Sequence, residues 1–201
     1  MKMKMNMKKH AFYGILAVVS LLGLGITQSA KANLVVNGGF ETGDFTGWTQ
    51  GGNGGFTGVS GTFGGVPPHS GNFQAFLGPV GSDGSLTQNL ATTGAGTYVI
   101  DFWLYNFGGT PSDFSVIWGG TTIFSLTNPG SFPYTEYTFN VTTSTNITAL
   151  EFDFRQDPSY FLLDDISVNA AVPDSGSTVV LLGAAMIVVG LVHRRIVAKR
   201  A

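Results

Sequence analysis

One short stretch, TYVIDFWLYNF at residues 97–107, holds side chains whose types and spacing suit the recognition of a sugar. Side chains alternate between faces along an extended strand, so Asp101, Trp103 and Tyr105 would share one face. Aromatic rings stack on the CH groups of a sugar, while a carboxylate accepts hydrogen bonds from its hydroxyls. The stretch is also apolar on both faces, which favours a central strand with Trp103 and Tyr105 in the core. Both interpretations are open at this point.

The acidic residues offer a second kind of chemistry, since glycoside hydrolysis requires two carboxyl groups about 5–10 Å apart across a cleft. Residues 33–171 contain eleven Asp and Glu residues, but the sequence does not place any two of them together. The same segment has His69 as its one histidine and has no lysine or cysteine, so triad, Schiff-base and thiol chemistry lack their residues. We therefore predict that the protein is not an enzyme, and a small glycoside hydrolase is the third hypothesis.

Charge is segregated along the chain. The first 32 residues contain five lysines, and the last eight contain a basic cluster formed by Arg194, Arg195, Lys199 and Arg200. Residues 33–171 have Arg155 as their single Arg or Lys against eleven acids, a net charge of −10 with His69 neutral. Such a segment has almost nothing with which to bind phosphate, so nucleic acid is excluded as a partner. Its negative charge would also keep it away from anionic glycans.

Composition and periodicity predict an all-β domain between the two basic ends. The chain has 29 glycines and is rich in Thr, Phe, Val and Tyr. The stretches TALEFDFRQ, EYTFNVTT and DFSVIW alternate with period two, and no helical periodicity competes. Residues 33–170 suffice for a single β-sandwich with a real core, in which we place Trp48 and Trp118. The glycine-rich residues 51–65 form a long loop or an insertion with a short strand.

Residues 1–32 are typical of a secretory signal peptide. Four lysines precede an apolar stretch, and AKA, with Ala30 and Ala32, is a cleavage site of the small-x-small type. The alternative is an uncleaved N-terminal anchor, because the apolar stretch is fairly long. Cleavage is favoured by the AKA ending, so the mature chain is expected to begin at Asn33 and to leave the cytoplasm through the secretion machinery.

The C-terminal segment 171–201 contains an uncharged stretch at residues 178–192. As a helix it would be about 22 Å long against a hydrocarbon core of about 30 Å, a marginal transmembrane length. Ser175–Ser177 and snorkelling basic side chains would help it to span the membrane. The positive-inside rule would then keep the basic tail in the cytoplasm and the domain outside.

A short motif lies immediately before this apolar stretch, formed by Val172, Pro173, Asp174, Ser175 and Gly176. The order of motif, apolar stretch and basic tail resembles the VPDSG variant of the PEP-CTERM class of bacterial sorting signals, which exosortase processes. The resemblance implies export, transient membrane anchoring by the C-terminal helix, and delivery to the cell surface or a biofilm matrix. A plain tail anchor preceded by a turn is the alternative.

Four segments support a second resemblance. They are NLVVNGGFETGDFTGW at residues 33–48, HSGNFQAFLG at 69–78, GSLTQNL at 84–90 and YFLLDDISV at 160–168. Their order and spacing resemble those of jelly-roll carbohydrate-binding modules and related galactose-binding-like domains, over nearly the whole domain. The resemblance implies a jelly-roll β-sandwich. This fold hosts sugar binding, protein binding and plain spacers alike, so it does not define the function.

The same resemblance implies a structural calcium site. In the family, the glutamate of the opening motif and an aspartate of the closing pair often help to bind calcium, and the matching residues are Glu41 and Asp165, with Asp164 as a further candidate. Calcium takes about six to eight oxygen ligands, and glycine-rich turns supply carbonyl groups. The ion would join the first and last segments of the domain and do no chemistry. Alternatively, these carboxylates cap turns and face water.

The sequence thus predicts a secreted, exosortase-sorted envelope or matrix protein with a structural or adhesive β-sandwich, in contact with extracellular polysaccharide. The alternative function is a carbohydrate-binding module with its own glycan ligand, bound by Trp103 and Tyr105.

Overall fold

The computed structural model describes residues 32–171 and the isolated positions 187, 188, 195 and 198. Several predicted features lie outside the described residues: the signal peptide with Ala30, the motif Val172–Gly176, most of the stretch 178–192, and Arg194, Lys199 and Arg200. In the described part of the chain, no helix has the length and apolar character needed to cross a membrane.

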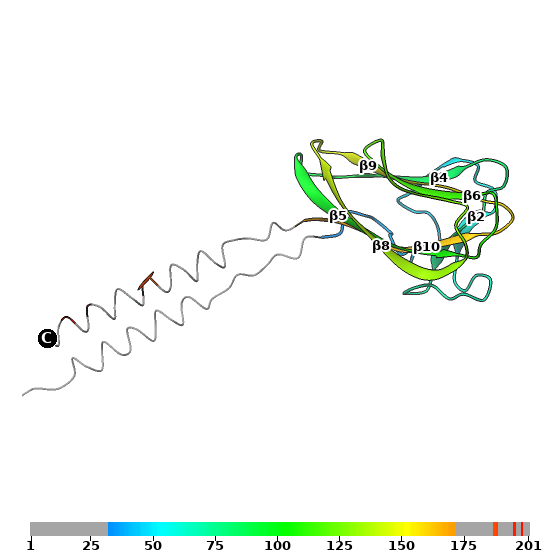
Figure 1. Ribbon diagram of the computed structural model, residues 1–201, viewed down its shortest axis with the longest axis horizontal. Helices are drawn as coiled ribbons and strands as arrows, with labels where there is room; N and C mark the ends of the chain where they lie inside the picture. The colour runs from blue at the N-terminus through cyan, green and yellow to red at the C-terminus, as the bar shows by residue number, and fades with distance from the viewer. Residues whose placement is uncertain (1–31, 172–186, 189–194, 196–197, 199–201) are drawn as a thin grey trace, which may run out of the picture. The chain divides into compact units, whose positions relative to one another are not determined.

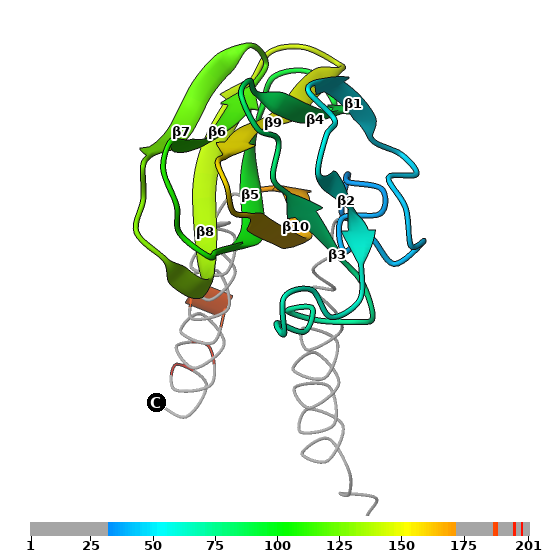
Figure 2. The same ribbon diagram turned by 90° about the vertical axis from the view of Figure 1, so that its right-hand side faces the viewer.

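Ten strands within residues 32–171 form two antiparallel five-stranded sheets. In chain order they are β1 (Thr49–Gly52), β2 (Thr57–Ser60), β3 (Gln74–Leu77), β4 (Gly84–Leu90), β5 (Gly96–Asn106), β6 (Ser112–Trp118), β7 (Thr121–Thr127), β8 (Phe132–Thr143), β9 (Thr148–Gln156) and β10 (Phe161–Ala170). One sheet has the order β1-β4-β9-β6-β7 and the other β2-β3-β10-β5-β8. The sheets face each other as two layers (Figures 1 and 2), which confirms the predicted all-β sandwich.

The core lies between the sheets and is built by alternating side chains. Every second residue of β9 is buried, including Phe152 and Phe154. Phe102 of β5 meets them from the opposite sheet, with its ring centroid 5.3 Å from that of Phe152 in an edge-to-face contact. Trp48 and Trp118 are 8% and 5% exposed, so their predicted places in the core are confirmed.

The opening segment of the domain runs beside its last strand. The main-chain N–H of Leu34 donates to the carbonyl of Val168 at 2.9 Å, and the side chain of Asn33 accepts from the Val168 N–H at 2.8 Å. Further along, the N–H of Ile166 donates to the carbonyl of Gly38 at 3.0 Å. A Cβ on Gly38 would lie 2.0 Å from the Ile166 oxygen, so this close approach requires glycine. The two ends of the domain therefore lie side by side.

The outward-facing side of the β1-β4-β9-β6-β7 sheet concentrates negative charge. Asp153 lies on β9 between Glu151 and Arg155, and Asp113 of β6 pairs with Arg155 in the ladder. Arg155 donates to Asp157 at 2.6 Å, so its charge is already paired. Burial raises the pKa of Asp153 to about 6, and the charge of Glu151 adds to this effect. The pKa of Asp113 is raised as well, mainly by burial.

The raised pKa of Asp153 predicts that the domain is more stable at mildly acidic pH than above neutrality. Between the ordinary value of 3.8 and about 6, the folded chain binds more protons than the unfolded chain, so the free energy of unfolding falls as pH rises through this window. The variant Asp153→Asn removes this charge and should flatten the pH dependence of Tm and raise Tm at about pH 8. Thermal melts across the pH series test this, and an unchanged slope in the variant contradicts it.

Candidate functional site

Strand β5 places the three residues of the predicted sugar-binding stripe on one side of its sheet. Asp101, Trp103 and Tyr105 are half-buried and alternate with fully buried core residues. In the ladder, Trp103 lies between Glu136 of β8 and Asp164 of β10. We call this side of the β2-β3-β10-β5-β8 sheet, which points away from the core, the outer face. Trp103 and Tyr105 are not members of the core cluster, so their burial has another cause.

That cause is the connection between β2 and β3, residues 61–73, which lies against the outer face. The ring of His69 stacks on Trp103 with centroids 3.7 Å apart and an interplanar angle of 14°. His69 also contacts the edge of Tyr134, with centroids 5.5 Å apart. The histidine thus covers the ring surface on which a sugar was predicted to stack. The motif HSGNF at residues 69–73, part of the family resemblance, belongs to this loop, and β3 begins only at Gln74.

The buried side chain of Gln74 fixes the middle of the loop. Its Nε2 donates to the carbonyl oxygens of Gly61 and Val66 at 2.7 and 2.9 Å. Its Oε1 accepts the hydroxyl of Tyr134 from β8. Gln74 is 0% exposed, and these partners satisfy an amide that would otherwise be costly to bury.

Eight aromatic side chains form a continuous layer where the loop meets the sheet, and we call it the aromatic layer. Its tightest apolar pair is Phe63 of the loop on Phe76 of β3, stacked at 4.4 Å and 9°. Its members are His69, Trp103, Tyr134, Tyr105, Phe107, Phe63, Phe76 and Tyr160. The seven Phe, Tyr and Trp members are half-buried. The layer therefore holds the loop to the sheet as a satellite hydrophobic cluster and still presents ring surface to solvent.

The three predicted calcium ligands, Glu41, Asp164 and Asp165, all contact this loop. Glu41 accepts the main-chain N–H groups of Asn72 and Phe73 at 2.8 and 3.1 Å, and the Asn72 side-chain amide at 3.2 Å. The N–H of Asn72 is the main cause of the lowered pKa of Glu41, followed by that of Phe73. Glu41 therefore stays ionised and fastens the end of the loop just before β3.

Asp164 and Asp165 hold the earlier loop residues His69 and Ser70 by hydrogen bonds. The fully buried Asp164 accepts the main-chain N–H groups of His69 and Ser70 on Oδ2, at 2.9 and 3.2 Å, and that of Asp165 on Oδ1 at 2.8 Å. Asp165 lies 2.6 Å from His69 Nδ1 and accepts the Ser70 hydroxyl at 2.6 Å. A β-bulge before Ser167, with Asp165 at φ 51°, lets both carboxylates reach the same loop. Burial raises the pKa of Asp164 to about 7, and the charge of Asp165 contributes.

Gly39 marks the space that these three acids share. A Cβ on Gly39 would lie 3.6 Å from Oδ1 of Asp164 and of Asp165, and 3.7 Å from Cγ of Glu41. Within residues 32–171, however, no three His, Asp or Glu side chains are arranged to hold a metal ion. Any calcium bound here would need two carboxylates supplemented by carbonyl oxygens. The calcium site therefore stays a prediction.

Asp101, the third member of the sugar-binding stripe, is held by its neighbours in the sheet. Its Oδ1 accepts the hydroxyl of Thr138 at 2.7 Å, and its Oδ2 lies 3.4 Å from the hydroxyl of Ser167. Each carboxylate oxygen accepts more than one hydrogen bond, so Asp101 can still accept a ligand hydroxyl. It is thus oriented on the outer face, about 7 Å along the strand from Trp103.

The acids do not line either of two surface cavities in the described part of the domain. One cavity is lined by threonines near Trp118 and the other by apolar residues around Phe56 and Tyr160, and neither is lined by an Asp or Glu. The raised pKa of Asp153 is what a general acid requires, yet this residue lies on the other sheet among further carboxylates.

The C-terminal segment matches a family model described as the VPDSG-CTERM motif over residues 171–196. This match confirms the sorting signal that was predicted from Val172–Gly176 and its flanking residues. No curated protein matches the chain.

Solved structures with a similar fold include carbohydrate-binding modules. The module TmCBM61, in complex with β-1,4-galactotriose, has a TM-score of 0.59 at 19% identity and covers 70% of this chain and 99% of its own. The CBM22-1 xylan-binding domain from Paenibacillus barcinonensis Xyn10C has a TM-score of 0.50 at 15% identity, covering 70% and 96%. The enzymatically active domain of bacteriophage CBA120 tailspike protein 4 has a TM-score of 0.53 at 12% identity, covering 69% and 21%.

At these identities the likeness shows the fold alone. The chain therefore joins a jelly-roll domain with the fold of carbohydrate-binding modules to a C-terminal VPDSG-CTERM sorting motif.

Proposed function

We propose that the protein is exported, sorted by exosortase and displayed at the cell surface or in an extracellular matrix, where its β-sandwich acts as an adhesive module that binds a neutral polysaccharide. The observation that supports glycan binding most directly is the aromatic layer, whose half-buried rings line the outer face next to Asp101 and Glu136. Rings beside carboxylates provide both contacts that a sugar needs, CH stacking and hydroxyl acceptance.

His69 stacks on Trp103, so the rings of the outer face fall into two groups. Tyr105 and Tyr134 lie beside the histidine, and Trp103 lies beneath it. A sugar first packs against Tyr105 and Tyr134, whose centroids are 5.6 Å apart, beside the histidine. Displacing His69 from Trp103 extends the site by one ring, since the histidine occupies that ring's stacking surface. The net charge of −10 over residues 33–171 disfavours an anionic chain, so the ligand class is a neutral glycan. We assign the domain no catalytic role, because its binding surface is built from rings rather than from an acid pair.

The first prediction from this proposal concerns Tyr105. Replacing it by alanine removes a ring of the aromatic layer but none of the core, so the full-length protein in mild detergent should lose neutral-glycan binding about tenfold or more while remaining folded. Binding is measured on a glycan array and by titration with the best glycan. Phe124→Ala is the matched control, because Phe124 is a half-buried ring on β7 in the other sheet. Equal losses in both variants, or none in Tyr105→Ala, contradict the proposal.

The second prediction concerns sorting and export. In a host that has an exosortase, the mature protein should begin at Asn33 and lack the basic tail with Arg194 and Arg195. Intact mass spectrometry of the cell-surface fraction reports both ends at once. Replacing Pro173 and Asp174 by alanine should leave the tail attached and the protein in the membrane fraction. A wild-type protein that keeps its tail in such a host contradicts exosortase processing and favours a plain anchor.

We further propose that calcium binds in front of Gly39, with Asp164 and Asp165 as ligands and Glu41 nearby. The support is electrostatic: the carboxylate oxygens of Asp164 and Asp165 both face this space, and Glu41 lies beside it. A bound cation would supply positive charge that strengthens the hold on the loop, and it would take part in no reaction.

Calcium should therefore raise the Tm of the metal-stripped full-length protein, and chelation should reverse the shift. At about one hundred times Kd, a ligand adds about 2.7 kcal/mol to the free energy of unfolding, which is several degrees for a domain of this size. Gly39→Ala fills the shared space with a methyl group at ordinary contact distance and should abolish the shift. Gly130→Ala, where a Cβ meets nothing within 4 Å, should keep it. If wild type shows no shift, or Gly39→Ala shows the same one, calcium does not bind here.

A further inference from the structure

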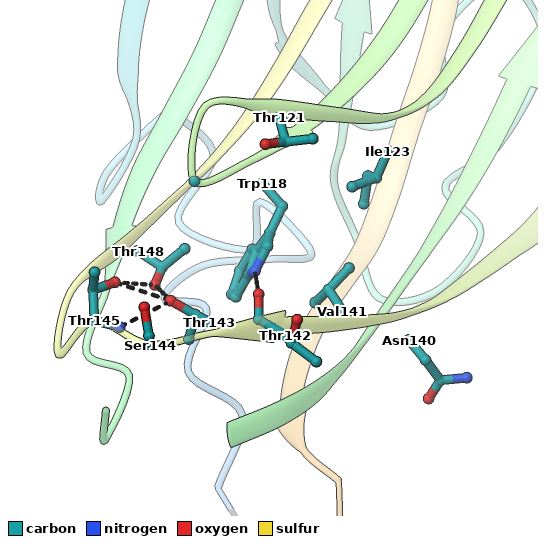
Figure 3. A pocket seen from close by; sticks show the side chains of 11 residues that line it. Trp118, Thr121, Ile123, Asn140, Val141, Thr142, Thr143, Ser144, Thr145 and Thr148 are labelled. Atoms are coloured by element: carbon teal, nitrogen blue, oxygen red, sulfur yellow. Dashed lines mark hydrogen bonds between the residues drawn. The ribbon is translucent and has the colours of Figure 1, made fainter. Parts of the chain in front are cut away.

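A cavity opens at the edge of the sandwich, between the β6–β7 turn and the end of β8, and Figure 3 shows the side chains that line it. Its volume is about 480 Å³, within the range of small-ligand sites. One wall comes from the end of β6 and the start of β7, with Trp118 and Thr121, and the other from the end of β8 and the following turn, with Thr142 and Ser144. In Figure 3 the indole of Trp118 lies between these walls.

The chemistry of this pocket differs from that of the rest of the surface. None of its eleven lining residues is ionisable, although residues 33–171 are strongly acidic. Six of the eleven present hydroxyl groups: Thr121, Thr142, Thr143, Ser144, Thr145 and Thr148. Ile123 and Val141 add apolar surface. Hydroxyl and apolar groups without charge suit a neutral, polyhydroxylated ligand.

The floor of the pocket is already ordered. The indole N–H of Trp118 donates to the carbonyl of Thr142 at 2.9 Å, which ties β6 to β8. The hydroxyls of Thr143, Thr145 and Thr148 lie 2.8–3.0 Å from one another in a closed network. These groups are satisfied within the protein, so they hold the turn in shape and cost little further ordering when a ligand binds.

Other polar groups of the pocket remain available. The side chains of Thr121 and Ser144 form no hydrogen bond with another residue in the described part of the chain, and both residues are exposed. They offer donors and acceptors at the rim, whereas the side chains of Asn140 and Thr142 lie on the other face of β8 from the buried Val141. The pocket thus combines a rigid floor with unengaged polar groups at its rim, as a binding site for a small polar ligand requires.

We propose that this pocket is a second carbohydrate-binding site, which takes one or two residues of a neutral glycan. It goes beyond the outer-face site proposed above and shares only the ligand class with it. Thr142 pairs with Thr97 at the start of β5, whereas Tyr105 lies eight residues further along the same strand. At about 3.4 Å per residue the two sites are about 27 Å apart, too far for one short oligosaccharide to reach both.

The three tryptophans of the chain provide one experiment that separates the two sites. The indole N–H signal of Trp118 reports the pocket, that of Trp103 reports the outer face, and that of the core residue Trp48 serves as an internal control for folding. The ¹⁵N-labelled full-length protein in mild detergent is titrated with β-1,4-galactotriose and with xylohexaose, and with an alginate oligosaccharide as the anionic control.

The Trp118 signal should shift saturably with a neutral oligosaccharide and not with alginate. Thr121→Val combined with Ser144→Ala keeps the shape of the rim but removes two hydroxyls, so it should weaken this titration by about tenfold or more. Tyr105→Ala should leave the Trp118 titration unchanged. Unchanged Trp48 signals show that both variants are folded.

The remaining outcomes decide between the two sites. If only the Trp103 signal shifts, the pocket proposal is wrong and the outer-face function stands. If only the Trp118 signal shifts, the pocket is the glycan site and the outer-face assignment is wrong. If neither signal shifts with either neutral probe, both proposals are overturned for these glycans.

Discussion

The arrangement of the outer face depends on one buried carboxylate, that of Asp164. A loop that crosses a sheet face must find acceptors for its own N–H groups, and a buried carboxylate must find donors. Asp164 and the N–H groups of His69 and Ser70 meet both needs at once. Removing the donors would leave the fully buried Asp164 carboxylate without these two hydrogen bonds. Because this contact fixes the loop at His69, it also sets that ring on Trp103 and so assembles the aromatic layer.

The surfaces of the domain differ in charge and therefore in the ligands that they can bind. The β1-β4-β9-β6-β7 sheet carries Asp153 and Asp113, whose pKa values are raised by burial and by neighbouring carboxylates. Arg155 of the same sheet forms an ion pair with Asp157. The outer face also holds acids, but Asp164 and Asp165 are engaged by the loop. The pocket beside Trp118 is lined by no charged group at all. A neutral glycan meets no electrostatic penalty at either proposed site, whereas an anionic one is repelled by the acidic domain.

The sequence predicted the parts of the fold that depend on local pattern. Strand β9 matches the stretch TALEFDFRQ because strict alternation with one buried face leaves a single register. The loop that covers Trp103 could not be predicted, because an apolar strand has the same residue pattern whether a second sheet or a loop packs against it. The loop is held by contacts 95 residues apart, between His69 and Asp164, and no local pattern encodes such a pairing. The threonine pocket likewise draws its walls from separate segments around β6, β7 and β8. The acids Glu41 and Asp165 were placed together only through the family resemblance, and their metal remains untested.

Both proposed sites are built on one structural element, the long antiparallel pair of β5 and β8. The ladder between these strands is continuous from Gly96 to Leu104 and shifts its register before Asn106, so regular pairing joins the pocket to all but the Tyr105 end of the outer-face site. The sites should therefore bind independently, and any gain from having two comes from effective concentration rather than from cooperative change. Ala171, where the domain ends, donates its N–H to Thr97 next to the pocket, while the aromatic layer lies toward the opposite end of β5. The two proposed sites, about 27 Å apart near opposite ends of β5, are therefore placed to hold separate polysaccharide chains.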